Sequence, residues 1–235
     1  MGVGVFYGQE MYRRTGVPQG LVACGHGGTS MAQWSPALKA QGGNSFYGAM
    51  LRRYRKLGQP VAGLLWYQGC SDAGAPDGYT KNMVELVHAT RKDFRLPKLP
   101  WVVVQIGRVL GEGWAPASWN SIQDQQRRLP AVIQHLDVVP AGDLELDDGI
   151  HISARAFPRL AQRMARLADR MACGNRREAG AIFVKSIRPT VCKTPPRVYS
   201  AVEVTFGNVI GGLRSAGSPT GFSAVLGDGK ATNPF

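Results

Sequence analysis

The sequence predicts an α/β protein with a parallel sheet flanked by helices, followed by a partial β-rich region. From the start to about residue 172, short apolar runs alternate with segments whose apolar residues recur at helical spacing. That alternation is typical of a parallel sheet covered on both faces. After Cys173 the pattern changes to apolar and polar residues in alternation between glycine-containing turns. We therefore predict a first domain over 1–173 and a partial β-rich domain over 178–235.

Five segments of the first domain carry the helical pattern. In 45–57, for example, Tyr47, Met50 and Leu51 share one face, and Gly58 follows as a helix-ending residue. The predicted helices are 5–15, 45–57, 79–94, 117–128 and 158–171.

Four apolar runs alternate with these helices. The run 61–67 is nearly continuous, as expected for a central parallel strand, and 101–106 is a second buried strand. The C-terminal region adds a strand over 181–187, a half-buried strand over 202–206 and a turn at 227–229. The predicted strands of the parallel sheet are 20–24, 61–67, 101–106 and 133–139.

Composition narrows the class of protein. The 235 residues are 44% hydrophobic and 19% charged, which suits one globular domain with a partial second domain. No apolar run approaches the roughly 20 residues that span a bilayer, and no signal peptide is visible at the start. We therefore predict no membrane insertion.

The net charge of +12 raises the question of nucleic-acid binding. The basic residues are scattered, however, and their densest run, 155–177, alternates with Leu160, Met164 and Leu167 at helical spacing. That pattern is typical of an amphipathic helix with a solvated basic face, so we predict no nucleic-acid partner.

The cysteines and histidines give no metal site. The four residues of each type lack the spacing of metal ligands, so we predict no metal and no cofactor. The sequence leaves open whether Cys173 and Cys192 form a disulfide.

Asp148 and His151 form the most informative pair in the chain. An aspartate three residues before a histidine, on a loop entering a helix, can hold one imidazole nitrogen and leave the other free to take a proton. We therefore expect their side chains to lie within hydrogen-bonding distance, as the base and its orienting residue in a hydrolase. The alternative interpretation is a surface turn with an unrelated histidine.

Two further loops are expected beside this pair, at the carboxyl ends of the strands, where ligands bind in such sheets. Glycines in the first loop let backbone N–H groups approach an oxyanion, and amide and carboxylate groups follow a buried strand in the second. The alternative interpretation of the first loop is an ordinary glycine-rich turn without a role in binding. The expected oxyanion and substrate-binding residues are Gly27, Gly28, Thr29 and Trp34 in the first loop, and Gln68, Gly69 and Asp72 in the second.

These segments, in this order, resemble the sialate O-acetylesterases and family-six carbohydrate esterases of the SGNH hydrolase superfamily. The segment 66–73 is similar to the family block WYQGES(N/D)A, and 148–151 is similar to its D-x-IHP block. The similarity spans nearly all of 1–172, and 181–228 resembles the β-rich region of longer members. The resemblance implies an SGNH-hydrolase-like (flavodoxin-like) fold. Three other parts of the chain are also similar to the family. They are a block from 20–22 through 27–29 to Trp34, the glutamine Gln105 after a buried strand, and the helical segment 119–126.

The resemblance also implies an activity, the removal of acetyl groups from sugars by a Ser-His-Asp mechanism. His151 would act as general base and then general acid, with Asp148 orienting it. Backbone N–H groups around Gly28, with the loop 68–72, would stabilise the oxyanion. The implied substrate is an acetylated carbohydrate, no cofactor is needed, and the full-length parent would be secreted or periplasmic.

The sequence departs from the family pattern at the nucleophile. The family serine lies in a GQSN block upstream of the glycine-rich loop, and the similar 8–11 segment lacks the serine. We therefore expect the serine to precede residue 1, the first domain to be truncated at its N terminus, and the 235 residues alone to be inactive. Cys70, Gln123 and Ile152 stand where the family has Glu, Arg and Pro.

Two alternatives stay open. Ser30 or Cys70 could replace the missing serine as nucleophile. The chain could instead be a non-catalytic carbohydrate-binding remnant that keeps a pocket with Trp34, Trp66 and His151.

Overall fold

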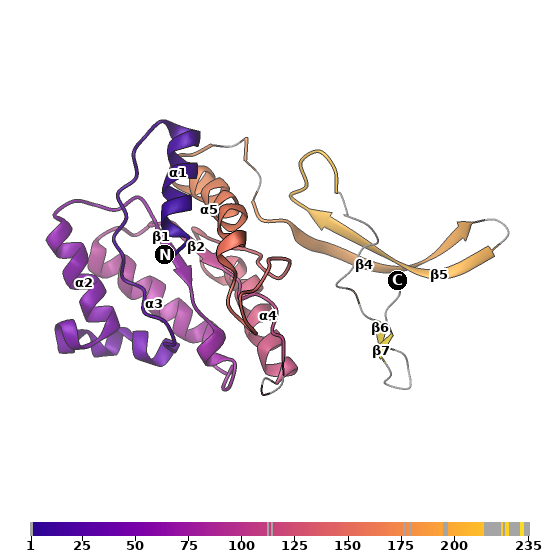
Figure 1. The fold of residues 1–235 in the computed structure, drawn as a ribbon, viewed down its shortest axis with the longest axis horizontal. Helices are drawn as coiled ribbons and strands as arrows, with labels where there is room; N and C mark the ends of the chain where they lie inside the picture. The colour runs from indigo at the N-terminus through magenta and orange to yellow at the C-terminus, as the bar shows by residue number, and fades with distance from the viewer. Residues whose placement is uncertain are drawn as a thin grey trace. The chain divides into compact units, whose positions relative to one another are not determined.

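The computed structural model describes residues 2–111, 113, 115–175, 177–178, 180–194, 197–213, 222, 224–225 and 231–232 (Figure 1). The chain divides into two compact units, Met1–Ala181 and Ile182–Phe235. Each unit is described by itself.

A parallel three-stranded sheet forms the centre of the first unit. Its order is β1 (Leu64–Tyr67), β2 (Trp101–Val104) and β3 (Leu136–Val139). The strands are in register, with Leu64 beside Trp101 and Trp101 beside Leu136. All three strands therefore start at one edge of the sheet, the amino edge, and end at the opposite edge, the carboxyl edge.

Helices cover both faces of this sheet, as predicted. Alternate side chains of β2 point to opposite faces: Trp101 and Val103 belong to one core cluster, and Val102 and Val104 belong to the other. The helices α2 (Phe46–Leu57), α3 (Tyr79–Phe94) and α4 (Pro116–Val132) contribute to the first cluster, and α1 (Gly4–Thr15) and α5 (Phe157–Ala172) contribute to the second.

The helix boundaries follow the sequence signals. The Ser45 side chain accepts a hydrogen bond from the N–H of Gly48 and so begins α2. Gly16 and Gly58 end α1 and α2 in the left-handed conformation that favours glycine. All five predicted helices are confirmed, and α4 runs four residues beyond the predicted end at 128, to Val132.

The segment 20–24 is not a strand, so the prediction for it was wrong. A strand requires a neighbour to pair with, and the described part of the chain offers none beside this segment. Its apolar side chains stay exposed, 49% for Leu21 and 43% for Val22. The strand predicted over 61–67 is present as β1, shortened to 64–67, and among the described residues it pairs only with β2 at one edge of the sheet.

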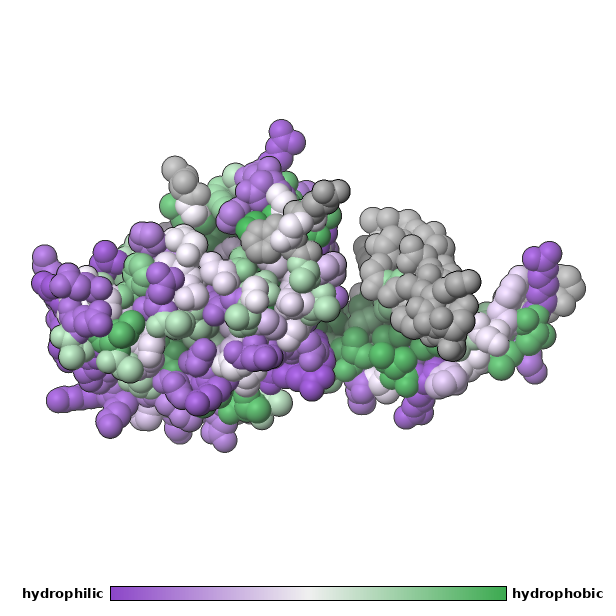
Figure 2. Space-filling view, turned by 90° about the horizontal axis from the view of Figure 1, so that it is seen from below, coloured by the Kyte–Doolittle hydropathy of each residue, from purple (hydrophilic) through white to green (hydrophobic). Residues whose placement is uncertain are grey.

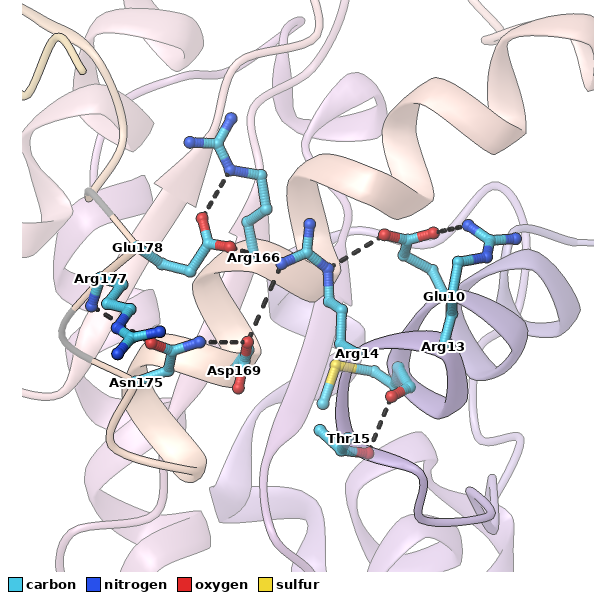
Figure 3. Close-up of polar contacts among 10 residues, drawn as sticks. Glu10, Arg13, Arg14, Thr15, Arg166, Asp169, Asn175, Arg177 and Glu178 are labelled. Atoms are coloured by element: carbon cyan, nitrogen blue, oxygen red, sulfur yellow. Dashed lines mark hydrogen bonds and ion pairs between the residues drawn. The ribbon is translucent and has the colours of Figure 1, made fainter. Parts of the chain in front are cut away.

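An ion-pair network fastens α1 to α5, which lie side by side (Figures 1 and 3). Glu10 is 7% exposed and accepts a hydrogen bond from Arg14 Nε at 3.0 Å. The same guanidinium donates to Glu178 at 2.6 Å and lies 3.8 Å from Asp169. Arg166 on α5 donates to the other oxygen of Glu178 at 2.9 Å. The network therefore joins two helices and the segment that follows α5.

The second unit contains an antiparallel hairpin of β4 (Phe183–Thr194) and β5 (Arg197–Gly207). Ile187, Val191, Val198 and Val202 lie on one face of the hairpin and are each more than half exposed, and Figure 2 shows hydrophobic side chains on its surface. The predicted β-rich character is confirmed.

Two short strands complete the second unit, β6 (Ala224–Val225) and β7 (Ala231–Thr232), which pair antiparallel. The predicted turn at 227–229 lies outside the described residues. Cys173, which ends the first predicted domain, carries a free thiol. Every helix in the described part of the chain is too short or too polar to cross a bilayer.

Candidate active site

The loop that follows β3 carries Asp148 and His151. It folds back on itself through an isolated bridge between Leu146 and Ile152, and the N–H of Asp147 donates to the carbonyl of His151 at 2.9 Å. The N–H of Ser153 donates to the carbonyl of Glu145 at 2.8 Å. These backbone contacts fix the turn before α5.

The Asp148 and His151 side chains are in direct contact, as predicted. His151 Nδ1 lies 2.7 Å from Asp148 Oδ2. The other carboxylate oxygen accepts the N–H groups of Ile150 and His151, each at 2.8 Å. The Ile150 N–H, the His151 ring and the His151 N–H together lower the pKa of Asp148 to about 2. The carboxylate is therefore ionised and holds Nδ1, which leaves Nε2 of a 67% exposed imidazole for proton transfer.

Gly149 lets a neighbouring loop approach this turn. The N–H of Leu110 donates to the Gly149 carbonyl at 2.8 Å. A Cβ on Gly149 would lie 2.7 Å from the Leu110 carbonyl oxygen, closer than real Cβ atoms come. The sequence gives only one signal of this requirement, the glycine between the aspartate and the histidine.

The second loop leaves β1 through Gln68 and Gly69. Gly69 has a φ of 149°, and a Cβ there would lie 2.8 Å from Gln126 Nε2 and 2.9 Å from Ile106 Cγ2. The Gln68 carbonyl accepts hydrogen bonds from Gln126 at 2.8 Å and from the Tyr79 hydroxyl at 3.0 Å. Buried side chains of α3 and α4 thus hold the end of β1.

The Gln68 amide joins the second loop to the first. Its Nε2 donates to the Thr29 carbonyl at 2.8 Å and to the Asp72 carboxylate. Asp72 also accepts the N–H of Met31 at 3.1 Å. Burial raises the pKa of Asp72, and the hydrogen bonds from Gln68 and Met31 oppose that rise. Gln68 Oε1 is buried without a hydrogen-bond partner in the described part of the chain.

The first loop places its predicted residues in different environments. Gly27 and Gly28 are exposed, and Gly28 has a φ of 69°. Thr29 is buried; its hydroxyl donates to the His26 carbonyl and accepts the Trp34 indole N–H, both at 2.9 Å. The glycines are therefore the accessible part of this loop.

Trp34 is a core residue, which corrects its prediction as a substrate-binding side chain. It is 3% exposed, stacks on Phe46 at a centroid distance of 5.3 Å and meets Trp66 edge-on at 5.1 Å. Trp66 is buried as well. The sequence around Trp34 does not show whether its side chain lines a pocket or lies in the core.

The three loops meet at the carboxyl edge of the sheet, as predicted. Gln68 bonds to Thr29, as described above, and Tyr67 at the end of β1 connects to the third loop. Burial raises the pKa of the Tyr67 hydroxyl, and the Asp148 carboxylate of the third loop is close enough to raise it further. Cys70 and Ile150 pack against the same core cluster.

Neither substitute nucleophile is suited to attack. Burial raises the pKa of the Cys70 thiol to about 11, so the thiolate is scarce at neutral pH. The Ser30 hydroxyl lies 3.4 Å from the Gln33 side chain, within a capping box that begins a short 3₁₀ helix. Among the residues that the structure describes, no serine hydroxyl hydrogen-bonds to His151.

Gln105 and Gln123 fasten the end of β2. Gln123 Nε2 donates to the carbonyls of Ile106 and Gly107 at 3.1 and 2.8 Å, and Gln105 Nε2 donates to the Gln123 carbonyl at 2.8 Å. At position 123, where the resembled family has an arginine, the glutamine therefore has a structural role.

The parallel sheet flanked by helices, with a C-terminal antiparallel hairpin, is an esterase-like α/β fold. The sequence matches the family described as carbohydrate esterase, sialic acid-specific acetylesterase over residues 1–170, and the chain belongs to that family.

Individual proteins resemble the chain over part of their length. A probable carbohydrate esterase of Arabidopsis thaliana is 30% identical over 153 residues, which are 62% of this chain and 54% of that protein. The chain thus spans about half the length of this curated relative. An X-ray structure of an Arabidopsis thaliana protein is 28% identical with a TM-score of 0.63, covering 74% of this chain and 70% of that one. A novel carbohydrate acetylesterase from Xanthomonas citri shares the fold at 22% identity and a TM-score of 0.68, over 80% and 45% of the two chains.

Proposed function

We propose that this protein is a carbohydrate O-acetylesterase of the sialate O-acetylesterase type, acting on an acetylated sugar by a Ser-His-Asp mechanism. The 2.7 Å contact between His151 Nδ1 and Asp148 Oδ2 carries this proposal, because it supplies an oriented base at the edge where three loops meet. Membership of a carbohydrate esterase family supports the substrate class.

In the proposed reaction, a serine hydroxyl attacks the acetyl carbonyl while His151 Nε2 takes its proton. Asp148, ionised by its hydrogen bonds, stabilises the imidazolium. The imidazolium then protonates the sugar oxygen as the acyl bond breaks, and a water molecule activated by the same base releases acetate. Backbone N–H groups at the exposed Gly27 and Gly28, with the Gln68 loop, stabilise the oxyanion.

The proposal includes a nucleophilic serine contributed by sequence that precedes residue 1, as the family resemblance implies. Two observations support it. β1 has a free edge within the described part of the chain, and the apolar Leu21 and Val22 are exposed where the family has a paired strand. A preceding strand that pairs with β1 would cover apolar surface and bring its carboxyl end to the edge that carries His151.

Hydrolysis of p-nitrophenyl acetate tests the proposal. We expect the 235-residue chain to be no faster than its His151→Ala variant, because loss of a triad nucleophile typically removes about 10⁶-fold of kcat. Extension with the codons that precede residue 1 in the gene, including a Gly-Gln-Ser run, is expected to restore His151-dependent turnover. A change of that added serine to alanine should abolish it again.

The opposite result is equally informative. Turnover by the 235-residue chain that depends on His151 would contradict an external nucleophile, and Ser30→Ala and Cys70→Ala would then identify the internal one. The alternative is a carbohydrate-binding remnant that keeps a pocket with Trp34, Trp66 and His151, and the burial of both indole rings argues against it.

A further inference from the structure

A cleft of about 810 Å³ lies at the amino edge of the sheet, at the opposite ends of the strands from Asp148 and His151. Three segments line it. The end of α3 contributes Arg91 and Lys92, the connection into β2 contributes Lys98, and the residue before β3 is His135. The cleft is therefore separate from the proposed esterase site.

The lining of this cleft carries charge of one sign. Arg91, Lys92, Arg95 and Lys98 all face it, and no carboxylate does. None of these four cations forms an ion pair in the described part of the chain, so their charge is not neutralised by a neighbouring carboxylate. A concave surface with cations of one sign concentrates the electrostatic potential and attracts anions.

A helix C-terminus explains only part of this arrangement. Cations in the last turn of α3 interact favourably with the helix dipole, which accounts for Arg91 and Lys92. Lys98 lies beyond the helix, on the connection into β2, so its place in the sequence does not follow from the last turn of α3.

Arg91 gives the cleft a fixed floor. It is 7% exposed, and its guanidinium donates to the carbonyls of Leu99, Gln134 and His135 at 2.8 to 3.1 Å. These carbonyls belong to the connections that enter β2 and β3. The two walls are therefore held together before any ligand arrives, which reduces the ordering cost of binding.

The backbone at two lining positions is unusual. Of the three non-glycine residues with positive φ in the described part of the chain, Arg95 at 55° and His135 at 54° both line the cleft. Arg95 occupies the position that ends α3, where glycine or asparagine would be less strained. The chain thus has a cation at a position where a smaller residue fits the backbone better.

We propose that this cleft binds an acidic segment of a polysaccharide, with carboxylate or sulfate groups, at a second carbohydrate site. The chain belongs to a carbohydrate esterase family, which favours a polysaccharide over other anionic polymers, and the cations of the lining complement its acidic groups. The site would hold an acidic polymer independently of ester hydrolysis, so the inference goes beyond the proposed function and does not depend on it.

Binding of the 235-residue chain to polygalacturonate tests this site, with sulfated and uncharged dextran as comparison ligands. The test variant is Lys92→Ala/Lys98→Ala. The control Lys81→Ala/Lys185→Ala removes the same charge from two exposed lysines that do not line the cleft. We expect the test variant to weaken polygalacturonate binding about tenfold, the sum of two exposed charge contacts, and the control to change it less than twofold. Uncharged dextran should not bind through the cleft.

The outcome separates three readings of the surface. Binding to sulfated dextran alone, with the same dependence on Lys92 and Lys98, would assign sulfate as the recognised group. Equal weakening in the test and control variants would overturn the site in favour of net charge. Tighter, cleft-dependent binding to single-stranded DNA than to polygalacturonate would overturn the polysaccharide assignment. No readout uses turnover, so failure here is distinguishable from failure of the proposed esterase activity.

Discussion

The two edges of the sheet use different chemistry to hold their loops. At the carboxyl edge, uncharged amides do the fastening: Gln126 and Gln123 bond to backbone groups, and Gly69 allows close contact with α4. At the amino edge, one buried guanidinium, Arg91, joins two connections through their carbonyls. The carboxyl edge is thus held by amides and by the carboxylates of Asp72 and Asp148 rather than by a buried cation. The amino edge instead gathers positive charge.

The largest expected effect is at Arg91. Arg91→Met leaves three carbonyls without their charged donor, so we expect a loss of about 2–4 kcal/mol in the free energy of unfolding. Urea denaturation followed by tryptophan fluorescence measures it. Lys92→Ala, at the next position of the same helix but exposed, should change stability by less than about 0.5 kcal/mol. Similar values for both variants would show that Arg91 does not hold the amino edge.

The carboxyl edge is tested at Gly69. Gly69→Ala places a Cβ against Gln126 and Ile106 at a φ that side chains rarely adopt, so we expect destabilisation of about 1–3 kcal/mol. Gly74→Ala is the matched control, because a Cβ there meets nothing within 4 Å. If both alanine variants unfold at the same urea concentration, the close contact at Gly69 is not a constraint.

The smallest expected effect is a change in the pKa of one carboxyl group, that of Asp148. Its pKa is lowered to about 2, so its interactions are fully present above the ordinary aspartate pKa and are lost as the pH falls toward 2. A ¹³C NMR titration of the carboxyl groups should give one aspartate midpoint near 2. His151→Ala should raise that midpoint but leave it below the ordinary value, because the Ile150 N–H is the largest cause. A midpoint near 4 in the unaltered chain would contradict the orienting contact.

The fold could be predicted largely from local signals. Apolar spacing and terminal glycines located all five helices, because those signals act within one or two turns of the chain. The strand prediction for 20–24 was wrong because strand formation does not depend on local signals alone. The apolar run of this segment has the composition of a strand, but strand formation depends on a partner that no local pattern can supply.

In the candidate site, contacts between residues close in the sequence could also be predicted, whereas contacts between distant residues could not. Asp148 and His151 are three residues apart, so their contact follows from local geometry. The bonds between Gln126 and Gln68 and between Gln126 and Ile106 span 58 and 20 residues. Gln126 lies in the block 119–126 that resembles the family, but its spacing does not show that it holds the loop. Trp34 was misplaced because an aromatic side chain suits a core and a sugar-binding surface equally well.

The network around Arg14 has a consequence for the order of folding. Arg14 and Glu178 are 164 residues apart, so α1 is synthesised well before its partners on α5 and in the segment that follows α5. Closing so long a loop is entropically costly, and these partners leave the ribosome after the sheet and helices α2 to α4. During synthesis, α1 must therefore wait with the apolar Tyr7 and Met11 uncovered while the sheet and its other helices assemble. Among the described helices of the first unit, α1 and α5 are thus the last to dock, and the sheet face that they cover is the last to close.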